Sequence, residues 1–334
     1  MDRDNPLTPI PLVVLTGYLG AGKTTHLNRW LKSPDAADTL VIVNEYGDVG
    51  LDHLLIEDAP GDVVLLAAGC LCCTVRGDLV ATLEDLLRRR DNGRIRFFRR
   101  VILETTGLAD PLPILHAVLQ HPYLSKRFTV ASVTTLVDAV NGADTLARHE
   151  EARRQVMLAD RLLLTKIDIA APETMAGVRR HLESLNPAVS ANLIEAATLS
   201  ATMLFEPLFS PSDETREQWL RDIPASSHVE AGDILTFSLA ADGAISPDAL
   251  IVFQEAMRLM HGPRILRLKG LLRLTDDSER PAAIHQVQSV TSPALRLARW
   301  PSRDRRSRLV VISQGLSREA VEPFWHALLK KGSV

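Results

Sequence analysis

Runs of apolar, often β-branched residues alternate with longer helix-periodic stretches from about residue 11 to residue 196. A strand that is covered on both faces reads as a nearly continuous apolar run, whereas a half-exposed strand alternates apolar and polar positions. Because the runs here are continuous and helical patterns separate them, they predict a parallel sheet with helices on both faces. The predicted strands are 12–16, 40–44, 63–66, 101–104, 130–137, 161–165 and 192–195, and the predicted helices include 24–31, 78–90, 112–119 and 172–185.

The pattern changes in the last third of the chain. Between about Phe209 and Asp233 it dissolves into a Ser- and Pro-containing stretch, which is typical of a linker. Beyond it we expect a strand over 234–239, a helix with Ser246 as its N-cap, three more strands and a final helix over 318–330. We therefore predict an α/β domain over residues 1–210, a linker over 211–232 and a smaller C-terminal α+β domain over 233–334.

Composition and charge narrow the class of protein. The 334 residues are 46% hydrophobic and carry 38 basic against 41 acidic side chains, for a net charge of −3. This length supports two domains with cores of their own, and the balanced charge excludes a bulk polyanion binder. The start lacks a signal-peptide pattern, and the longest apolar run, 63–73, is shorter than the ~18 residues of a membrane span. We expect a cytoplasmic protein with no membrane partner.

A phosphate-binding motif follows the first predicted strand. Residues 17–24 read Gly-Tyr-Leu-Gly-Ala-Gly-Lys-Thr, which matches the P-loop pattern in full between a strand and a helix. In such loops, backbone N–H groups and the helix N-terminus bind phosphate, the lysine reaches the terminal phosphates and the threonine hydroxyl ligates Mg²⁺. The match predicts a P-loop NTPase fold rather than an empty Gly-rich turn. The residues assigned to the nucleotide are Gly17, Gly20, Gly22, Lys23, Thr24 and Thr25, with Lys23 also catalytic and Thr24 also the Mg²⁺ ligand.

A second motif indicates which base the nucleotide carries. Thr165, Lys166 and Asp168 follow the sixth predicted strand in a Thr-Lys-x-Asp sequence, close to the Asn/Thr-Lys-x-Asp motif of GTPases. Guanine presents two adjacent donors that one carboxylate accepts together, and adenine lacks this pair. The alternative is a loop with a helix-capping Asp. The position after an apolar strand, far downstream of the P-loop, favours guanine and therefore GTP.

Polar residues also follow the fourth and second predicted strands. Glu104 ends an apolar run and is assigned a catalytic role in orienting Mg²⁺-bound or attacking water, with a solvent-exposed carboxylate as the alternative. Gly107, three residues later, is predicted to let its backbone approach the γ-phosphate. Residues 44–50 combine two glycines with two carboxylates, which fits a nucleotide-responsive switch and a simple turn equally well.

The three cysteines, Cys70, Cys72 and Cys73, lie within four consecutive positions. This spacing is poor for a disulfide framework and, in a reducing compartment, favours metal binding or catalysis. Three thiolates form part of a tetrahedron around an ion such as Zn²⁺ and leave one position open, which suits transfer better than storage. The clustering argues against three buried structural cysteines.

Together these motifs resemble the CobW family of P-loop GTPases, relatives of the urease and hydrogenase nickel-insertion GTPases, whose members are GTP-dependent metallochaperones. The resemblance implies that the three cysteines bind the cargo metal and that Glu45 approaches it. It also implies that residues 73–77, with Cys73, Thr74 and Gly77, lie near the nucleotide. The matching stretches are 17–25, 44–48, 69–73, 104–111, 165–168, 267–270 and 300–301.

Two departures from the family limit what the resemblance implies. Many relatives carry a His-rich stretch before or within the second domain, whereas the linker here holds only His228. Many also place a His where this chain has Ser289. A histidine reservoir for metal storage is therefore not expected, and the cysteine loop stays the predicted metal site.

We predict a slow GTPase that uses GTP and Mg²⁺, binds a transition metal and transfers it to an unknown client metalloprotein. The metal is Zn²⁺, with Co²⁺ as the alternative, because three thiolates accept both. A metal-responsive regulatory GTP-binding protein is the second hypothesis, and a small-molecule kinase is the third. The Arg-rich stretches 88–100 and 296–308 are interpreted as solvated surfaces, with docking to an acidic client protein as the alternative. Nucleic acid is disfavoured because aromatics are only 4% of the chain. The oligomeric state is left open between a single chain and a homo-oligomer.

Overall fold

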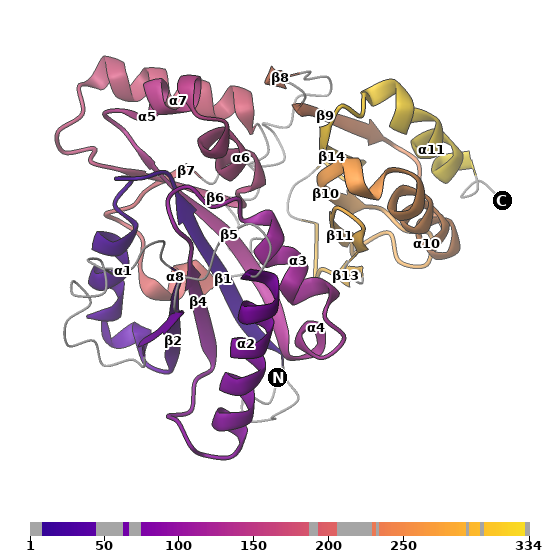
Figure 1. Ribbon diagram of the computed structural model, residues 1–334. Coiled ribbons are helices and arrows are strands. Elements are labelled where there is room, and N and C mark those ends of the chain that lie inside the picture. The colour runs from indigo at the N-terminus through magenta and orange to yellow at the C-terminus, as the bar shows by residue number, and fades with distance from the viewer. Residues whose placement is uncertain are drawn as a thin grey trace. The chain divides into compact units, whose positions relative to one another are not determined.

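The computed structural model describes residues 9–44, 63–66, 75–186, 193–205, 229–231, 234–291, 294–300 and 304–330. The chain divides into two compact units, Met1–His181 with Leu193–Leu208 and Leu182–Asn192 with Phe209–Val334. Each unit is built around a sheet of its own (Figure 1).

The first sheet is parallel throughout, with strand order β3-β2-β4-β1-β5-β6-β7. The first strand in the sequence is therefore central, with β4 on one side and β5 on the other. Loops at the carboxyl ends of neighbouring parallel strands meet at one edge, which is where open α/β sheets bind their ligands. The strands are β1 (Ile10–Gly17), β2 (Thr39–Asn44), β3 (Val63–Leu66), β4 (Arg100–Glu104), β5 (Phe128–Asp138), β6 (Arg161–Thr165) and β7 (Leu193–Glu195).

Helices cover both faces of this sheet, because successive side chains of a strand point to opposite faces. Val13 and Leu15 of β1 pack with Trp30 of α1 and Leu204 of α8. Leu12 is equally buried and faces the opposite side. Of the helices that pack against one another, α2, α3 and α4 form one group, and α6 contacts β1 and β5. The helices are α1 (Lys23–Leu31), η1 (Pro34–Ala36), α2 (Val75–Asp91), α3 (Leu112–Gln120), α4 (Leu124–Arg127), α5 (Gly142–Arg148), α6 (Glu150–Leu158), α7 (Pro172–Leu185) and α8 (Ala201–Phe205).

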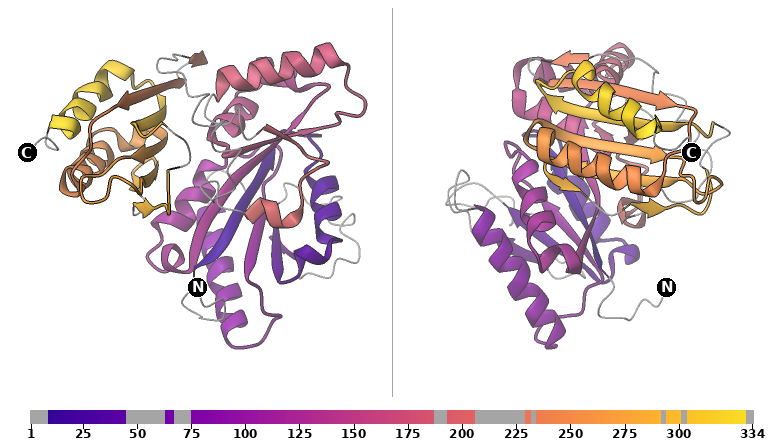
Figure 2. Two further views of the ribbon diagram at one scale, coloured as in Figure 1. Left: turned by 180° about the vertical axis from the view of Figure 1, so that it is seen from behind. Right: turned by 90° about the vertical axis from the view of Figure 1, so that its right-hand side faces the viewer.

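The second unit is an antiparallel sheet with two helices on one face (Figure 2). Phe237, Leu268 and Leu309 come from three different strands and share a core with Phe253 and Trp325 of the helices. The rings of Phe253 and Trp325 meet edge to face at 6.5 Å between centroids. The elements are β8 (Val229–Ala231), β9 (Ile234–Ala241), α10 (Pro247–Ala256), η4 (Met257–His261), η5 (Gly262–Arg264), β10 (Ile265–Leu272), β11 (Ala282–Val287), β12 (Val290–Thr291), β13 (Leu295–Arg296), β14 (Ser307–Gln314) and α11 (Arg318–Lys330).

The architecture confirms the predicted fold class. All seven strands predicted for the first unit are present, and the second unit is a smaller α+β fold with an antiparallel sheet. The helices named from the sequence did not include α4, α5, α6 or α8. Of these, α4, α5 and α8 are four to seven residues long, which is less than two helical turns. The short strand β8 pairs with β9 inside the range expected to be linker. Within the described residues, no helix combines the length and the hydropathy that crossing a bilayer requires.

Candidate functional site

The predicted phosphate loop joins the central strand to the first helix of the fold. Gly17 is the last residue of β1, and Lys23 is the first residue of α1. Gly20 and Gly22 have φ values of 74° and 88°, in the left-handed region that favours glycine. Gly22 is the N-cap of α1 and provides no side-chain cap, so no capping side chain occupies the amide groups of the first turn. Such a helix end is suited to bind an anion.

Two predicted catalytic or metal-binding side chains meet at the edge of the sheet. The Thr24 hydroxyl donates a hydrogen bond to Oε1 of Glu104 at 3.2 Å. Glu104 lies beside Leu15 in the β1–β4 register and is only 4% exposed. The alternative of a solvent-exposed carboxylate is therefore wrong. A hydroxyl and a carboxylate side by side are hard oxygen donors, so this pair fits Mg²⁺.

Lys23 folds back over the phosphate loop. Its Nζ atom donates to the carbonyl oxygen of Gly17 at 2.8 Å and lies 3.5 Å from that of Tyr18. The ammonium group thus lies on the loop that the P-loop pattern assigns to phosphate. Thr25, the residue after the P-loop pattern, is exposed on α1.

The segment after β4 packs directly against the phosphate loop. The backbone N–H of Thr105 donates to the carbonyl of Leu15 at 2.9 Å and extends the β1–β4 pairing. A Cβ atom placed on Gly107 would lie 2.7 Å from the backbone nitrogen of Leu19, which is closer than real Cβ contacts allow. Only glycine fits here, because the two backbones touch. The structure therefore brings Gly107 to the phosphate loop.

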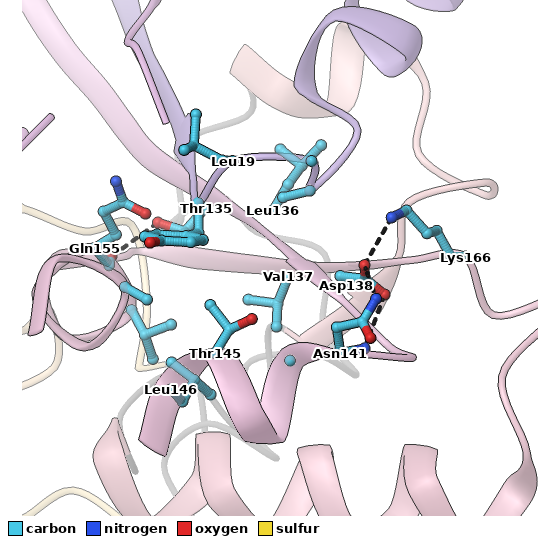
Figure 3. A pocket seen from close by; sticks show the side chains of 16 residues that line it. Leu19, Thr135, Leu136, Val137, Asp138, Asn141, Thr145, Leu146, Gln155 and Lys166 are labelled. Atoms are coloured by element: carbon cyan, nitrogen blue, oxygen red, sulfur yellow. Dashed lines mark hydrogen bonds and ion pairs between the residues drawn. The ribbon is translucent and has the colours of Figure 1, made fainter. Parts of the chain in front are cut away.

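The predicted guanine motif is tied to the same loop. The Thr165 hydroxyl donates to the carbonyl of Ala21 at 2.9 Å, across 144 positions of sequence. Lys166 has a φ of 55° and its Nζ donates to Oδ2 of Asp138 at 2.7 Å (Figure 3). Asp168 is exposed, as a residue that reads an incoming base must be. The predicted guanine motif and the phosphate loop thus lie together at one edge of the first sheet.

Asp138 is a site residue that the sequence analysis missed. It ends β5 and accepts hydrogen bonds from the backbone N–H groups of Val140 and Asn141 at 2.7 and 3.2 Å. Burial alone raises the pKa of its carboxyl, but the bonds from Lys166 and the two amides outweigh burial and hold the pKa below its usual value. The signal available was the one used for Glu104, a carboxylate at the end of an apolar strand.

A cavity of about 170 Å³ lies between the phosphate loop, the end of β5, and helices α5 and α6. Tyr18 of the loop lines it and stacks on His149 with 4.6 Å between ring centroids. Lys166 and Asp138 line it as well (Figure 3). Thr24, Glu104 and Asp168 do not. The Thr24–Glu104 pair is therefore not part of this cavity.

His26 has a packing role. Its ring lies 5.9 Å from that of Trp30, and burial, with help from Arg29, lowers its pKa. The imidazole is therefore held neutral at physiological pH.

Several predicted site residues lie outside the described residues. These are Glu45, Cys70, Cys72, Cys73 and Thr74; Gly77 lies within the backbone of α2. Among the residues that are described, no group of three or more His, Cys, Asp or Glu side chains could hold a metal ion. The predicted cargo-metal site thus stays a prediction.

The arginine-rich stretches are largely engaged within the protein. Arg90 is 8% exposed, donates to the carbonyl of Phe98 at 2.8 Å and pairs with Asp91. In the second unit Arg305 pairs with Glu279, and Arg308 pairs with Asp304. These contacts favour the structural interpretation of both stretches over docking.

Comparison with protein families matches both units of the chain. Residues 11–192 match the family described as CobW/HypB/UreG, nucleotide-binding domain. Residues 234–329 match the cobalamin synthesis protein cobW C-terminal domain. The first match covers more than half of the chain and includes the whole phosphate loop.

Individual relatives are similar over different lengths. The zinc chaperone YjiA of Escherichia coli is 31% identical over 82% of this chain and 85% of its own length. The zinc-regulated GTPase metalloprotein activator 1 of Schizosaccharomyces pombe is 34% identical over 56% of this chain, but over only 46% of its own length. The crystal structure of Zn(II)-bound YjiA GTPase from E. coli aligns with a TM-score of 0.68 at 25% identity and covers 96% of this chain and 99% of that one.

Proposed function

The chain belongs to the CobW/HypB/UreG family, and we propose that it is a GTP-hydrolysing chaperone that binds Zn²⁺ and passes it to a client metalloprotein. The observation that carries the proposal is the phosphate loop with the Thr24–Glu104 pair beside it, in a chain similar over most of its length to a zinc chaperone. We place this activity in the cytoplasm.

Different described residues contact the phosphates, Mg²⁺ and the base of the nucleotide in this proposal. Lys23 and the amide groups at the start of α1 neutralise phosphate charge, and Gly107 brings its backbone to the γ-phosphate position. Thr24 and Glu104 would hold Mg²⁺, which when bound supplies further positive charge beside the phosphates. Glu104 also orients water at the same edge. Lys166 and Asp168 bind guanine. The hydrogen bond from Thr165 to Ala21 fixes the position of this motif relative to the phosphate loop.

The zinc ion is the cargo in this proposal. Cys70, Cys72 and Cys73 bind it through their thiolates, with Glu45 near the open coordination position. GTP orders residues 44–52 against the cysteine loop, and hydrolysis relaxes that contact, so that the metal leaves for the client. The two sites then affect one another by equal factors, since thermodynamic coupling is reciprocal.

A metal titration in two nucleotide states tests the proposal. The purified protein is titrated with Co²⁺, whose thiolate charge-transfer band reports cysteine ligation, and with Zn²⁺ in competition. Each titration is run with GTP and Mg²⁺, then with GDP, and then repeated on Cys72→Ser. We expect the metal affinity to differ about tenfold between nucleotide states, which is ~1.4 kcal/mol of coupling. We expect Cys72→Ser to lose most of the metal affinity in both states.

Three outcomes separate the hypotheses. Equal metal affinity in both nucleotide states would support a regulatory GTP-binding protein without a delivery role. Undiminished binding by Cys72→Ser would place the metal elsewhere. Tight binding of ATP in preference to GTP would contradict the guanine assignment and revive the kinase hypothesis.

A further inference from the structure

A buried glutamine on α6 holds the turn that follows Glu104. Gln155 is 0% exposed, and its Nε2 donates to the carbonyl oxygens of Gly107 and Ala109 at 3.1 and 3.0 Å. The Thr135 hydroxyl of β5 donates to the backbone carbonyl of Gln155 at 2.9 Å. One side chain thus joins two carbonyls of the segment that packs against the phosphate loop.

The held segment is a tight turn. The Ala109 N–H donates to the carbonyl of Thr106 at 3.1 Å, so Gly107 and Leu108 occupy the two central positions. In a planar trans peptide the C=O and N–H point in opposite directions. Since the Gly107 carbonyl points at Gln155, the N–H of Leu108 points away from α6. Gln155 therefore determines which way this part of the turn presents its backbone donors.

Only a donor fits at this position. The two atoms that face the Gln155 amide are carbonyl oxygens, so a reversed amide would set an acceptor against two acceptors. Its Oε1 atom is buried and has no hydrogen-bond partner among the described residues. The amide thus keeps both carbonyl bonds although its own oxygen is left without one.

We infer that Gln155 is a positioning residue, which holds the turn at residues 106–109 in the orientation that recognises the γ-phosphate. The inference rests on the proposed GTP-binding function. Gly107 touches Leu19 of the phosphate loop on one side and is held by Gln155 on the other, so the turn cannot shift without breaking one of these contacts. In the proposed function the backbone of Gly107 in this turn approaches the γ-phosphate, a group that GDP lacks. Loss of Gln155 therefore acts on GTP and spares GDP.

The test compares two nucleotides on one variant. Gln155→Leu keeps the side-chain volume and removes the donor. If the correct turn then forms in about one molecule in ten, the apparent affinity for a slowly hydrolysed GTP analogue falls about tenfold. Affinity for GDP is expected to change by less than a factor of about two, because the γ-phosphate is absent. Both affinities are measured by calorimetry on the full chain.

Two further variants separate the role of Gln155 from a general loss of stability. Met157→Ala, at a buried position of the same helix, should lower the melting temperature and leave the GTP-to-GDP affinity ratio unchanged. Thr135→Val removes the bond to the Gln155 carbonyl and is expected to reproduce the selective loss in weaker form; it decides the question if Gln155→Leu does not fold. Equal loss of both nucleotides, or of neither, overturns the inference. Failure of the unchanged protein to bind GTP overturns the proposed function instead.

Discussion

At the scale of single residues, the site depends on contacts between side chains and backbone that tolerate little change. Thr165 reaches the carbonyl of Ala21, Lys166 reaches Asp138, and Gly107 lies against Leu19 without room for a methyl group. Each contact joins segments that follow different strands. A substitution at one of them should therefore change ligand binding more than it changes secondary structure.

Asp168→Asn should exchange the preferred base. Guanine offers two donors to a carboxylate, whereas xanthine replaces the exocyclic amine with a carbonyl that accepts from an amide. Losing bonds to a charged acceptor costs ~1.5–3 kcal/mol, so we expect affinity for GTP to fall at least about tenfold while affinity for XTP rises. Competition binding with GTP, XTP and ATP measures this. Unchanged GTP affinity would mean that Asp168 only caps a loop.

Gly107→Ala should disturb the phosphate loop. The new Cβ atom would lie 2.7 Å from the nitrogen and 2.8 Å from the Cα of Leu19, both backbone atoms. Overpacking of this kind costs ~1–3 kcal/mol, and we expect urea unfolding to shift accordingly and GTP binding to weaken. Gly177→Ala is the matched control, because nothing lies within 4 Å of its Cβ and it sits inside α7. That change should be neutral or stabilise by up to ~1 kcal/mol. Similar effects from both would contradict the close-contact argument.

At the scale of elements, helices α1 and α10 differ in how their N-termini are capped. α1 begins at Gly22 with no side-chain cap, which leaves its first amide groups to a ligand. α10 begins at Ser246, whose hydroxyl accepts from the Ala249 N–H at 3.1 Å, with Pro247 in the first turn. The first start suits phosphate binding, and the second only stabilises the helix.

Ser246→Ala should therefore destabilise the second unit without touching the nucleotide. The loss of an N-cap costs ~1 kcal/mol. Ser246→Asp keeps an acceptor at the same place and should retain most of the stability. Thermal unfolding gives the comparison, and GTP affinity should be equal in all three proteins. A fall in GTP affinity for Ser246→Ala would contradict this division.

At the scale of the whole molecule, carboxylates paired with cations link folding to pH. Hydrogen bonds from Arg127 and Arg90 lower the pKa of Asp91, with burial opposing them. For Asp138, burial opposes the lowering and the bonds from Lys166 and the amides prevail. A carboxyl whose pKa is lower in the folded state stabilises the fold above its unfolded pKa, and this contribution is lost as the pH falls through the folded pKa.

We expect the free energy of unfolding to fall as the pH drops below about 4, the ordinary range of an aspartate. Asp138→Asn should lose stability at pH 7, because Lys166 loses its charged partner, and should then show a shallower decline in acid. Urea midpoints between pH 7 and pH 3 measure both slopes. Parallel curves for the two proteins would mean that Asp138 contributes nothing to the pH dependence.

Local pattern determined much of this protein, because periodicity and short motifs are properties of neighbouring residues. Continuous apolar runs sufficed for the seven strands of the first sheet, and Ser246 with Pro247 sufficed for the start of α10. The phosphate loop was identified because its motif is a run of consecutive residues. Glu104 was identified because it directly follows the apolar run of a strand. The cysteine loop and Glu45 stay predictions, since they lie outside the described residues.

Only the tertiary structure decided which of these pieces meet. Gln155 lies 48 positions from Gly107, and Asp138 lies 28 positions from Lys166, so no local pattern connects either pair. Strand order brings them together, because β1 lies between β4 and β5, and β6 lies beside β5. The sequence by itself determined the parts of a nucleotide site. The packing of parallel strands determined which side chains hold those parts in place.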